Sequence, residues 1–153
     1  LDDGTLIREA PAIFRFVEAM HPEPNLLGNN PKEAAEIEAW ERFSEFNGIG
    51  AIGEYFRNQT EGLAGRGLPG PTKLDLIPAL VERGAARAGY FYQQLNEQLG
   101  KTEYVGSNRY SIADITAHCC VDFANAVSLG IPEDCPSVAR WYKAVSGRAS
   151  AGA

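Results

Sequence analysis

The sequence is poor in the side chains that usually carry metal or nucleophilic chemistry. Its 153 residues include only two histidines, His21 and His118, and three cysteines. The cysteines, Cys119, Cys120 and Cys135, are odd in number and lack C-x-x-C spacing, and no histidine is placed to complete a zinc site. A His-rich metal centre, a disulfide framework and a Ser-His-Asp triad are therefore all disfavoured. We expect no metal cofactor.

Long apolar runs and basic clusters are also missing. No stretch approaches the roughly 18 apolar residues that a membrane span needs, and the first residues lack the basic-then-apolar order of a secretory signal. The formal net charge of -6 would repel nucleic acids and anionic membranes. With 44% hydrophobic residues, the chain can still build a sizeable core. These features predict a soluble, cytoplasmic protein whose partners are neither nucleic acids nor membranes.

The chain opens on a turn-like segment. The sequence Asp-Asp-Gly at residues 2–4 separates Leu1 from the strand-like residues 5–7, which predicts the end of a β-hairpin. An isolated two-stranded hairpin is marginal in water, so we expect the natural protein to extend further towards the N-terminus. Pro11 then suits the first position of a helix, because apolar residues recur every three or four positions after it.

The remaining residues predict helices joined by loops. Asn30 and Pro31 suit the N-cap and first position of a long helix, in which three glycines within residues 48–53 indicate close packing or a kink. Residues 62–73 are rich in glycine and proline and predict a loop, after which Asp75 can cap the next helix. The expected helices span residues 11–20, 31–58, 75–99, 111–127 and 136–146.

The sharpest local signal is the sequence Ser111-Ile112-Ala113-Asp114. Ser111 can accept a hydrogen bond from a first-turn amide, and Asp114 can accept one from the amide of Ser111, which is a capping box. Tyr110 and Ile115 flank the pair as a hydrophobic staple. A serine and an aspartate also suggest a catalytic pair, but a capping box explains their spacing completely. We therefore assign them a structural role.

Three segments of the chain resemble motifs of the bacterial-type cytosolic glutathione transferases. Residues 3–13 (DGTLIREAPAI) resemble the family segment D-G-x-x-L-x-E-S-x-A-I, residues 111–115 resemble its buried capping box, and residues 136–150 resemble its terminal P-x-x-x-x-W...R-P-S. The resemblance implies a mainly α fold: a C-terminal helical bundle preceded by the last β-strand and helix of a thioredoxin-like domain. Residues 1–24 would be the remnant of that glutathione-binding domain, and residues 25–153 the all-α C-terminal domain.

The resemblance also implies a function. Members of the family conjugate the co-substrate glutathione, through its thiolate, to electrophilic small molecules in detoxification, and they are commonly homodimers. Their thiolate-stabilising residue lies near the N-terminus, so we expect the catalytic residue to lie N-terminal to Leu1 and the 153-residue chain alone to be inactive. The alternative is a non-catalytic glutathione transferase-like module for ligand binding or assembly.

Glu9 and Ala10 match the E-S pair that, by this resemblance, grips the γ-glutamyl end of glutathione. The amides and positive dipole end of the helix that starts at Pro11 favour a carboxylate, and Glu9 can pair with an ammonium group. Ala10 departs from the motif because it lacks the serine hydroxyl, which supports the non-catalytic alternative. Glu9 has a second possible role as a first-turn acid that only interacts with the helix dipole.

The resemblance further implies that the long helix forms a wall of the electrophile pocket. In this family that helix faces the glutathione-binding half, and an apolar wall suits apolar substrates. The candidate residues are Ile49, Ile52, Tyr55 and Phe56. A place in the ordinary helical core is an equally open alternative for them, and Tyr55 could also donate a hydrogen bond to a substrate.

Overall fold

The computed structural model describes residues 1–152 and consists of helices joined by loops. No named β-strand occurs among these residues. The helices are α1 (Ala10–Met20), α2 (Pro31–Phe43), α3 (Gly50–Gln59), α4 (Ala79–Leu99), α5 (Ile112–Ala126) and α6 (Pro136–Ser146), with a π-helix η1 (Ser44–Ile49) and two 3-10 turns, η2 (Glu61–Leu63) and η3 (Ala149–Gly152). The expected mainly α fold is confirmed.

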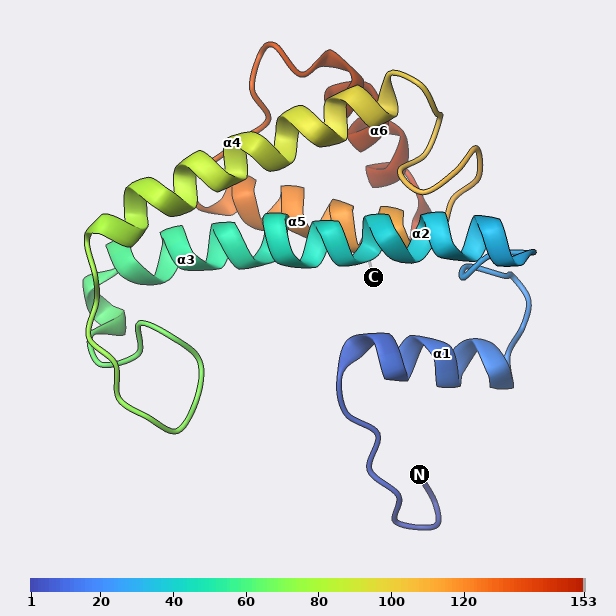
Figure 1. The fold of residues 1–153 in the computed structure, drawn as a ribbon, viewed down its shortest axis with the longest axis horizontal. Helices are drawn as coiled ribbons and strands as arrows, with labels where there is room; N and C mark the ends of the chain where they lie inside the picture. Colours follow the sequence, from blue (N-terminus) through green and yellow to red (C-terminus); the bar gives the residue numbers. More distant parts are fainter. Residues whose placement is uncertain (153) are drawn as a thin grey trace.

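Helices α2, η1 and α3 follow one another as a continuous rod along the length of the molecule (Figure 1). Helix α4 packs against α3 and α6, and α5 packs against α2 and η1. In the view of Figure 1, α1 and the loop formed by residues 60–78 lie on the side of the rod away from α4. In this view of Figure 1 the rod lies between the packed bundle on one side and α1 with this loop on the other.

The hydrophobic core lies within the bundle. On α4 the buried positions follow helical spacing through Ala88, Phe91, Leu95 and Leu99, and α6 contributes Trp141 to the same cluster. By contrast, no residue of α1 is buried. The bundle is therefore the stable body of the molecule, to which α1 is attached.

The long helix expected over residues 31–58 forms as α2, η1 and α3 in succession, and it changes to a π-helix in the stretch that includes Gly48. Its middle section is π-helical where α5 comes closest, and a side chain at Gly48 would place a Cβ 2.5 Å from the Sγ atom of Cys120. The Cys120 thiol donates a hydrogen bond to the carbonyl of Ser44 at 3.3 Å. Glycine is therefore required for the close packing that the sequence indicated.

Two expectations about local structure are wrong. Residues 5–7 form no strand: the Thr5 carbonyl accepts from the Leu1 ammonium at 2.9 Å, but among residues 1–152 no second strand lies beside this segment. The turn before them does form, with the Gly4 amide 2.9 Å from the Leu1 carbonyl. Asp75 does not cap α4, which begins at Ala79, because residues before that point are bound into the preceding loop: the Ile77 amide donates to Asn58 Oδ1 at 2.8 Å.

Helices α3 and α4 cross with their backbones in near contact at Gly84. A Cβ atom there would lie 2.6 Å from the Tyr55 nitrogen and 2.9 Å from the Ala51 oxygen. Both are backbone atoms, so neither can rotate away as a side chain would. Any residue larger than glycine must push the two helices apart.

We therefore predict that Gly84→Ala lowers the free energy of unfolding by about 1 to 3 kcal/mol, the usual range for overpacking. Gly89→Ala, on the same helix with no atom within 4 Å of the new Cβ, is the matched control and should stabilise the chain by up to about 1 kcal/mol through helix propensity. Urea denaturation of both variants measures the difference. Equal effects of the two substitutions would show that the crossing does not depend on glycine.

Candidate functional site

A cavity of about 690 Å³ opens between α3, the loop 60–78, the start of α4 and one aromatic residue of α5. This volume lies within the range of about 300 to 1,000 Å³ that is typical of small-molecule sites. Phe56 of α3 and Phe123 of α5 meet edge to face at one wall, with ring centroids 5.6 Å apart. The apolar lining includes Ile49, Phe56, Leu68, Leu74, Ile77 and Phe123.

The loop that closes this cavity is held in place by polar contacts. Asn58, only 6% exposed at the end of α3, accepts the hydrogen bond from the amide of Ile77. Within the loop, the Gly67 amide donates to the Leu74 carbonyl at 3.0 Å. A Cβ atom at Gly67 would lie 2.6 Å from the Asp75 carbonyl oxygen, so only glycine permits this approach. The glycine-rich segment therefore has a defined shape, although it has no helix or strand along most of its length.

The charged side chains of the cavity differ in how they are paired. Glu54 accepts hydrogen bonds from Arg83 at 2.9 and 2.6 Å, with Arg87 3.7 Å away, and the bond from Arg83 holds the pKa of this carboxyl below its usual value. Arg57 donates to the backbone carbonyl of Arg66 at 3.2 Å. Within residues 1–152 it has no carboxylate oxygen closer than 4.0 Å. The cavity wall thus includes a guanidinium group that is not neutralised by an ion pair.

The structure divides the four residues expected at the electrophile wall. Ile49 and Phe56 line the cavity. Ile52 has no exposed surface and lies in the core, and Tyr55 is not in the lining but has its backbone against Gly84. Tyr55 lies on the side of α3 that packs against Gly84 of α4. Ile52 is one helical turn before Phe56, but the core encloses it, so tertiary packing and not helical spacing separates it from the cavity.

Sequence reasoning missed most of the cavity, because it treated residues 62–73 only as a connection. Leu68, Leu74 and Ile77 are 60%, 42% and 51% exposed and line the cavity together. The presence of several apolar side chains in this loop sequence was the signal that could have indicated a binding surface. The contribution of Phe123 depends on the packing of α5 against α3 and had no signal in the local sequence.

Glu9 and Ala10 lie at the start of α1, and both are exposed. Glu9 is the N-cap with φ of 68°, an uncommon conformation for a residue other than glycine, and its side chain makes no capping hydrogen bond. Its carbonyl accepts from the amides of Ala12 and Ile13, both at 3.1 Å. The Glu9 carboxylate is therefore available to a ligand, beside a helix end that attracts negative charge.

Ser111 and Asp114 occupy a fully buried position at the start of α5. One oxygen of Asp114 accepts from the Ser111 amide at 2.9 Å and the Ser111 hydroxyl at 3.1 Å. The other accepts from the Val105 amide at 2.9 Å and from Nε1 of Trp141 at 2.8 Å. Burial raises the pKa of the Asp114 carboxyl, and the four hydrogen bonds oppose this shift. Neither residue has exposed surface with which to meet a substrate.

We predict that Asp114→Ala lowers the free energy of unfolding by about 1 to 3 kcal/mol, because it leaves buried donors without an acceptor. Asp122→Ala is a suitable control on the same helix, since the Asp122 side chain is 48% exposed. This change should cost less than about 1 kcal/mol. Chemical denaturation of the two variants tests the difference, and similar losses would contradict a structural role specific to Asp114.

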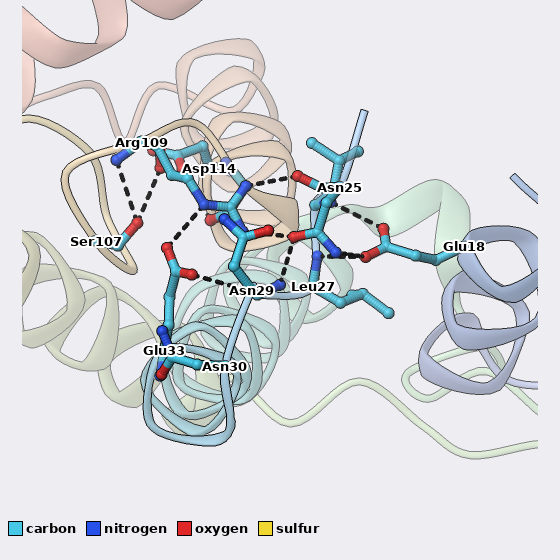
Figure 2. A network of polar contacts seen from close by, with 12 residues as sticks. Glu18, Asn25, Leu27, Asn29, Asn30, Glu33, Ser107, Arg109 and Asp114 are labelled. Carbon is cyan, nitrogen blue, oxygen red and sulfur yellow. Dashed lines mark hydrogen bonds and ion pairs between the residues drawn. The ribbon is translucent and has the colours of Figure 1, made fainter. Parts of the chain in front are cut away.

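The orientation of α1 depends on a polar network around the linker that follows it (Figure 2). The Glu18 carboxylate of α1 accepts from Asn25 Nδ2 at 2.6 Å and from the amides of Leu26 and Leu27 at 2.9 and 3.0 Å. Arg109, from the loop before α5, donates to the carbonyl and side-chain oxygens of Asn25 at 2.5 and 2.6 Å. The linker is thus bound on one side to α1 and on the other to the bundle.

Arg109 also joins this network to the start of α2. Its Nε donates to Glu33 at 2.7 Å, and the bond holds the pKa of the Glu33 carboxyl below its usual value. The other Glu33 oxygen accepts from the Asn29 amide at 2.8 Å, while Asn30 caps α2 by accepting from the Glu33 amide at 3.0 Å. One guanidinium group therefore links the start of α2, the loop before α5 and the linker that holds Glu18 of α1.

Replacing Arg109 by lysine should loosen this arrangement, since a lysine ammonium cannot reproduce the three directed contacts of the guanidinium. We expect faster amide exchange at Leu26 and Leu27 and a loss of about 1 to 2 kcal/mol in stability. Arg140→Lys, which affects a contact to the Leu99 carbonyl in the bundle, is the control and should leave exchange at the linker unchanged. Unchanged exchange in the Arg109 variant would mean that other contacts hold α1.

Other reactive side chains lie away from this cavity. His118 Nε2 is 2.9 Å from Ser146 Oγ, and its Nδ1 is 3.3 Å from Asp122, but none of these three residues lines the cavity. Burial raises the pKa of the Cys120 thiol to about 12 and also raises that of Cys119, so both are protonated at neutral pH.

Within residues 1–152 no group of His, Cys, Asp or Glu side chains is arranged to hold a metal ion. In the same range, no helix has the length and apolar character to cross a membrane.

Comparisons with known proteins agree with this architecture. Residues 79–149 match the family described as "Glutathione S-transferase, C-terminal domain". The chain is 33% identical to Glutathione S-transferase 2 of Saccharomyces cerevisiae over 154 aligned positions, which cover 98% of the chain and 62% of the yeast protein. The chain therefore spans less than two thirds of the length of this relative.

Solved structures give the same result at the level of the fold. The crystal structure of Gtt2 from S. cerevisiae superposes with a TM-score of 0.89 at 30% identity, covering 99% of this chain and 71% of that one. A glutathione S-transferase of class Gtt2 from Vibrio parahaemolyticus has a TM-score of 0.82 at 33% identity, with 99% and 68% covered. The chain belongs to the glutathione S-transferase family.

Proposed function

We propose that this chain forms the electrophile-binding part of an enzyme that conjugates glutathione, through its thiolate, to an apolar small molecule. The observation that carries the proposal is the apolar cavity of about 690 Å³ against α3. Its loop and α1 lie on the same side of the rod in Figure 1. A ligand held at the start of α1 and a second ligand in the cavity would then face a common space.

The glutathione end of this proposal rests on α1. Residues 1–24 would be the end of the glutathione-binding domain, and residues 25–153 the helical domain. The γ-glutamyl group carries an ammonium and a carboxylate, which suit the Glu9 side chain and the positive end of the helix dipole. Ala10 can contribute only its backbone amide. The network around Arg109 would hold this group at a fixed position relative to the cavity.

The cavity's part in the reaction is to bind and orient the electrophile. An apolar wall removes water from the reacting carbon and holds it where the thiolate sulfur can approach, which lowers the entropic part of the barrier. With an aryl halide, a carbon-sulfur bond forms, the carbon-halogen bond breaks and halide ion leaves. We propose that the residue that stabilises the thiolate precedes Leu1. We further propose that the enzyme is a cytoplasmic homodimer and that its reaction requires no metal.

The test is a conjugation assay with glutathione and 1-chloro-2,4-dinitrobenzene, using the protein extended at its N-terminus to the length of its relatives. Phe56→Ala should raise the KM for the aryl halide by about 3- to 10-fold, as expected for loss of a buried aromatic contact, with little effect on the KM for glutathione. Phe46→Ala is the control, because Phe46 lies on the same rod but is 60% exposed and outside the cavity. The 153-residue chain alone should show no turnover.

The outcomes separate the proposal from a non-catalytic binding module, for which the missing hydroxyl at Ala10 is the main argument. No turnover by the extended protein would favour that alternative. Turnover with equal effects of the two phenylalanine variants would place the electrophile outside this cavity.

A further inference from the structure

We propose that the ligand of the cavity is an apolar molecule that carries an anionic group, and that Arg57 binds this group. The inference names the class of electrophile, so as a statement about substrates it rests on the function proposed above. The claim that the cavity binds such a ligand depends only on the residues of the cavity. Its basis is the contrast between Arg57 and the other charged side chains around it.

Arg57 is the cation of the cavity lining that has no acidic partner. The other lining arginine, Arg83, is committed to Glu54 by two hydrogen bonds. Arg57 makes a single contact to a backbone carbonyl, that of Arg66. A guanidinium group has five N–H donors in a planar fork, so most of its donors have no protein acceptor among residues 1–152. These donors suit a carboxylate or sulfonate, which accepts two parallel hydrogen bonds.

The local charge supports the same ligand class. The chain as a whole is acidic, with 14 basic and 20 acidic side chains. Residues 54–87, which contain most of the cavity, hold five basic and four acidic ones. The remaining acid of the lining, Asp75, is exposed on the loop, where water screens its charge. This part of the chain is thus less acidic than the rest, which makes it a less unfavourable place for an anion than the overall charge suggests.

The position of Arg57 fits an elongated ligand. Arg57 follows Phe56 directly and lies one turn after Gly53. A Cβ atom added at Gly53 would enter open space, with no neighbouring atom within 4 Å. The lining also includes the apolar side chains of Leu68 and Leu74 of the loop. An aromatic or aliphatic body can lie against these apolar groups while its charged end meets the guanidinium.

Two fluorescent probes test this directly in the 153-residue chain. They are 1-anilinonaphthalene-8-sulfonate and N-phenyl-1-naphthylamine, which share one aromatic skeleton and differ by the sulfonate. Titration should show that Arg57→Gln weakens binding of the sulfonate by about 5- to 10-fold, the effect of one charge-assisted contact, while the neutral probe changes by less than about 2-fold. Arg57→Lys should retain part of the preference.

Arg66→Gln is the matched control, since it removes the same charge from the neighbouring loop at an exposed side chain outside the lining. It should have little effect on either probe. Equal weakening of both probes by Arg57→Gln would mean that Arg57 only supports the loop, and equal effects of the two arginine variants would mean that no specific contact exists. Failure of the sulfonate to bind would also overturn the inference.

These outcomes are independent of the proposed reaction. Probe discrimination without conjugation would contradict the transferase function and leave the anion site standing. Conjugation activity, together with an affinity for the sulfonate probe that Arg57→Gln does not change, would contradict the anion site and leave the transferase function standing.

Discussion

The carboxylate of Asp114 is the interaction on which the rest of the structure depends. It is fully buried, and its four donors come from three places in the chain: Ser111 at the start of α5, Val105 in the loop before it, and Trp141 of α6. A buried charge of this kind is tolerated only when its hydrogen bonds are complete. The geometry of the loop 101–110 is thereby fixed, and with it the point from which Arg109 reaches the linker and holds α1.

The functional arrangement follows from which face of each helix is left uncovered. Glycines at positions 48 and 84 let α5 and α4 pack closely on one side of the rod. The side of the rod that these crossings leave free keeps Ile49 and Phe56 available for the cavity, next to Arg83 of α4 and Phe123 of α5. Glycine at position 67 allows the loop to fold back over that side. Small residues thus decide both where the core is dense and where space remains for a ligand.

Much of this fold was accessible from the sequence, because its signals are local. The N-cap residues Asn30 and Ser111 and the proline-started helix at Pro136 mark helix ends through short-range chemistry, and the structure places those ends accordingly. The membership of the cavity was harder to predict. Helical spacing alone did not show that Ile52 lies in the core while Phe56 lines the cavity, because the two are one turn apart and the difference depends on tertiary packing. Phe123 and the loop residues come together only through tertiary packing.

The most direct test of the account is a structure of the N-terminally extended protein bound to S-(2,4-dinitrophenyl)glutathione, the product of conjugation to an aryl halide. The account predicts that the dinitrophenyl ring lies in the cavity against Ile49 and Phe56, and that the γ-glutamyl group lies at the start of α1 beside Glu9 and Ala10. A complex with the ring outside this cavity, or with the γ-glutamyl group away from α1, would contradict it.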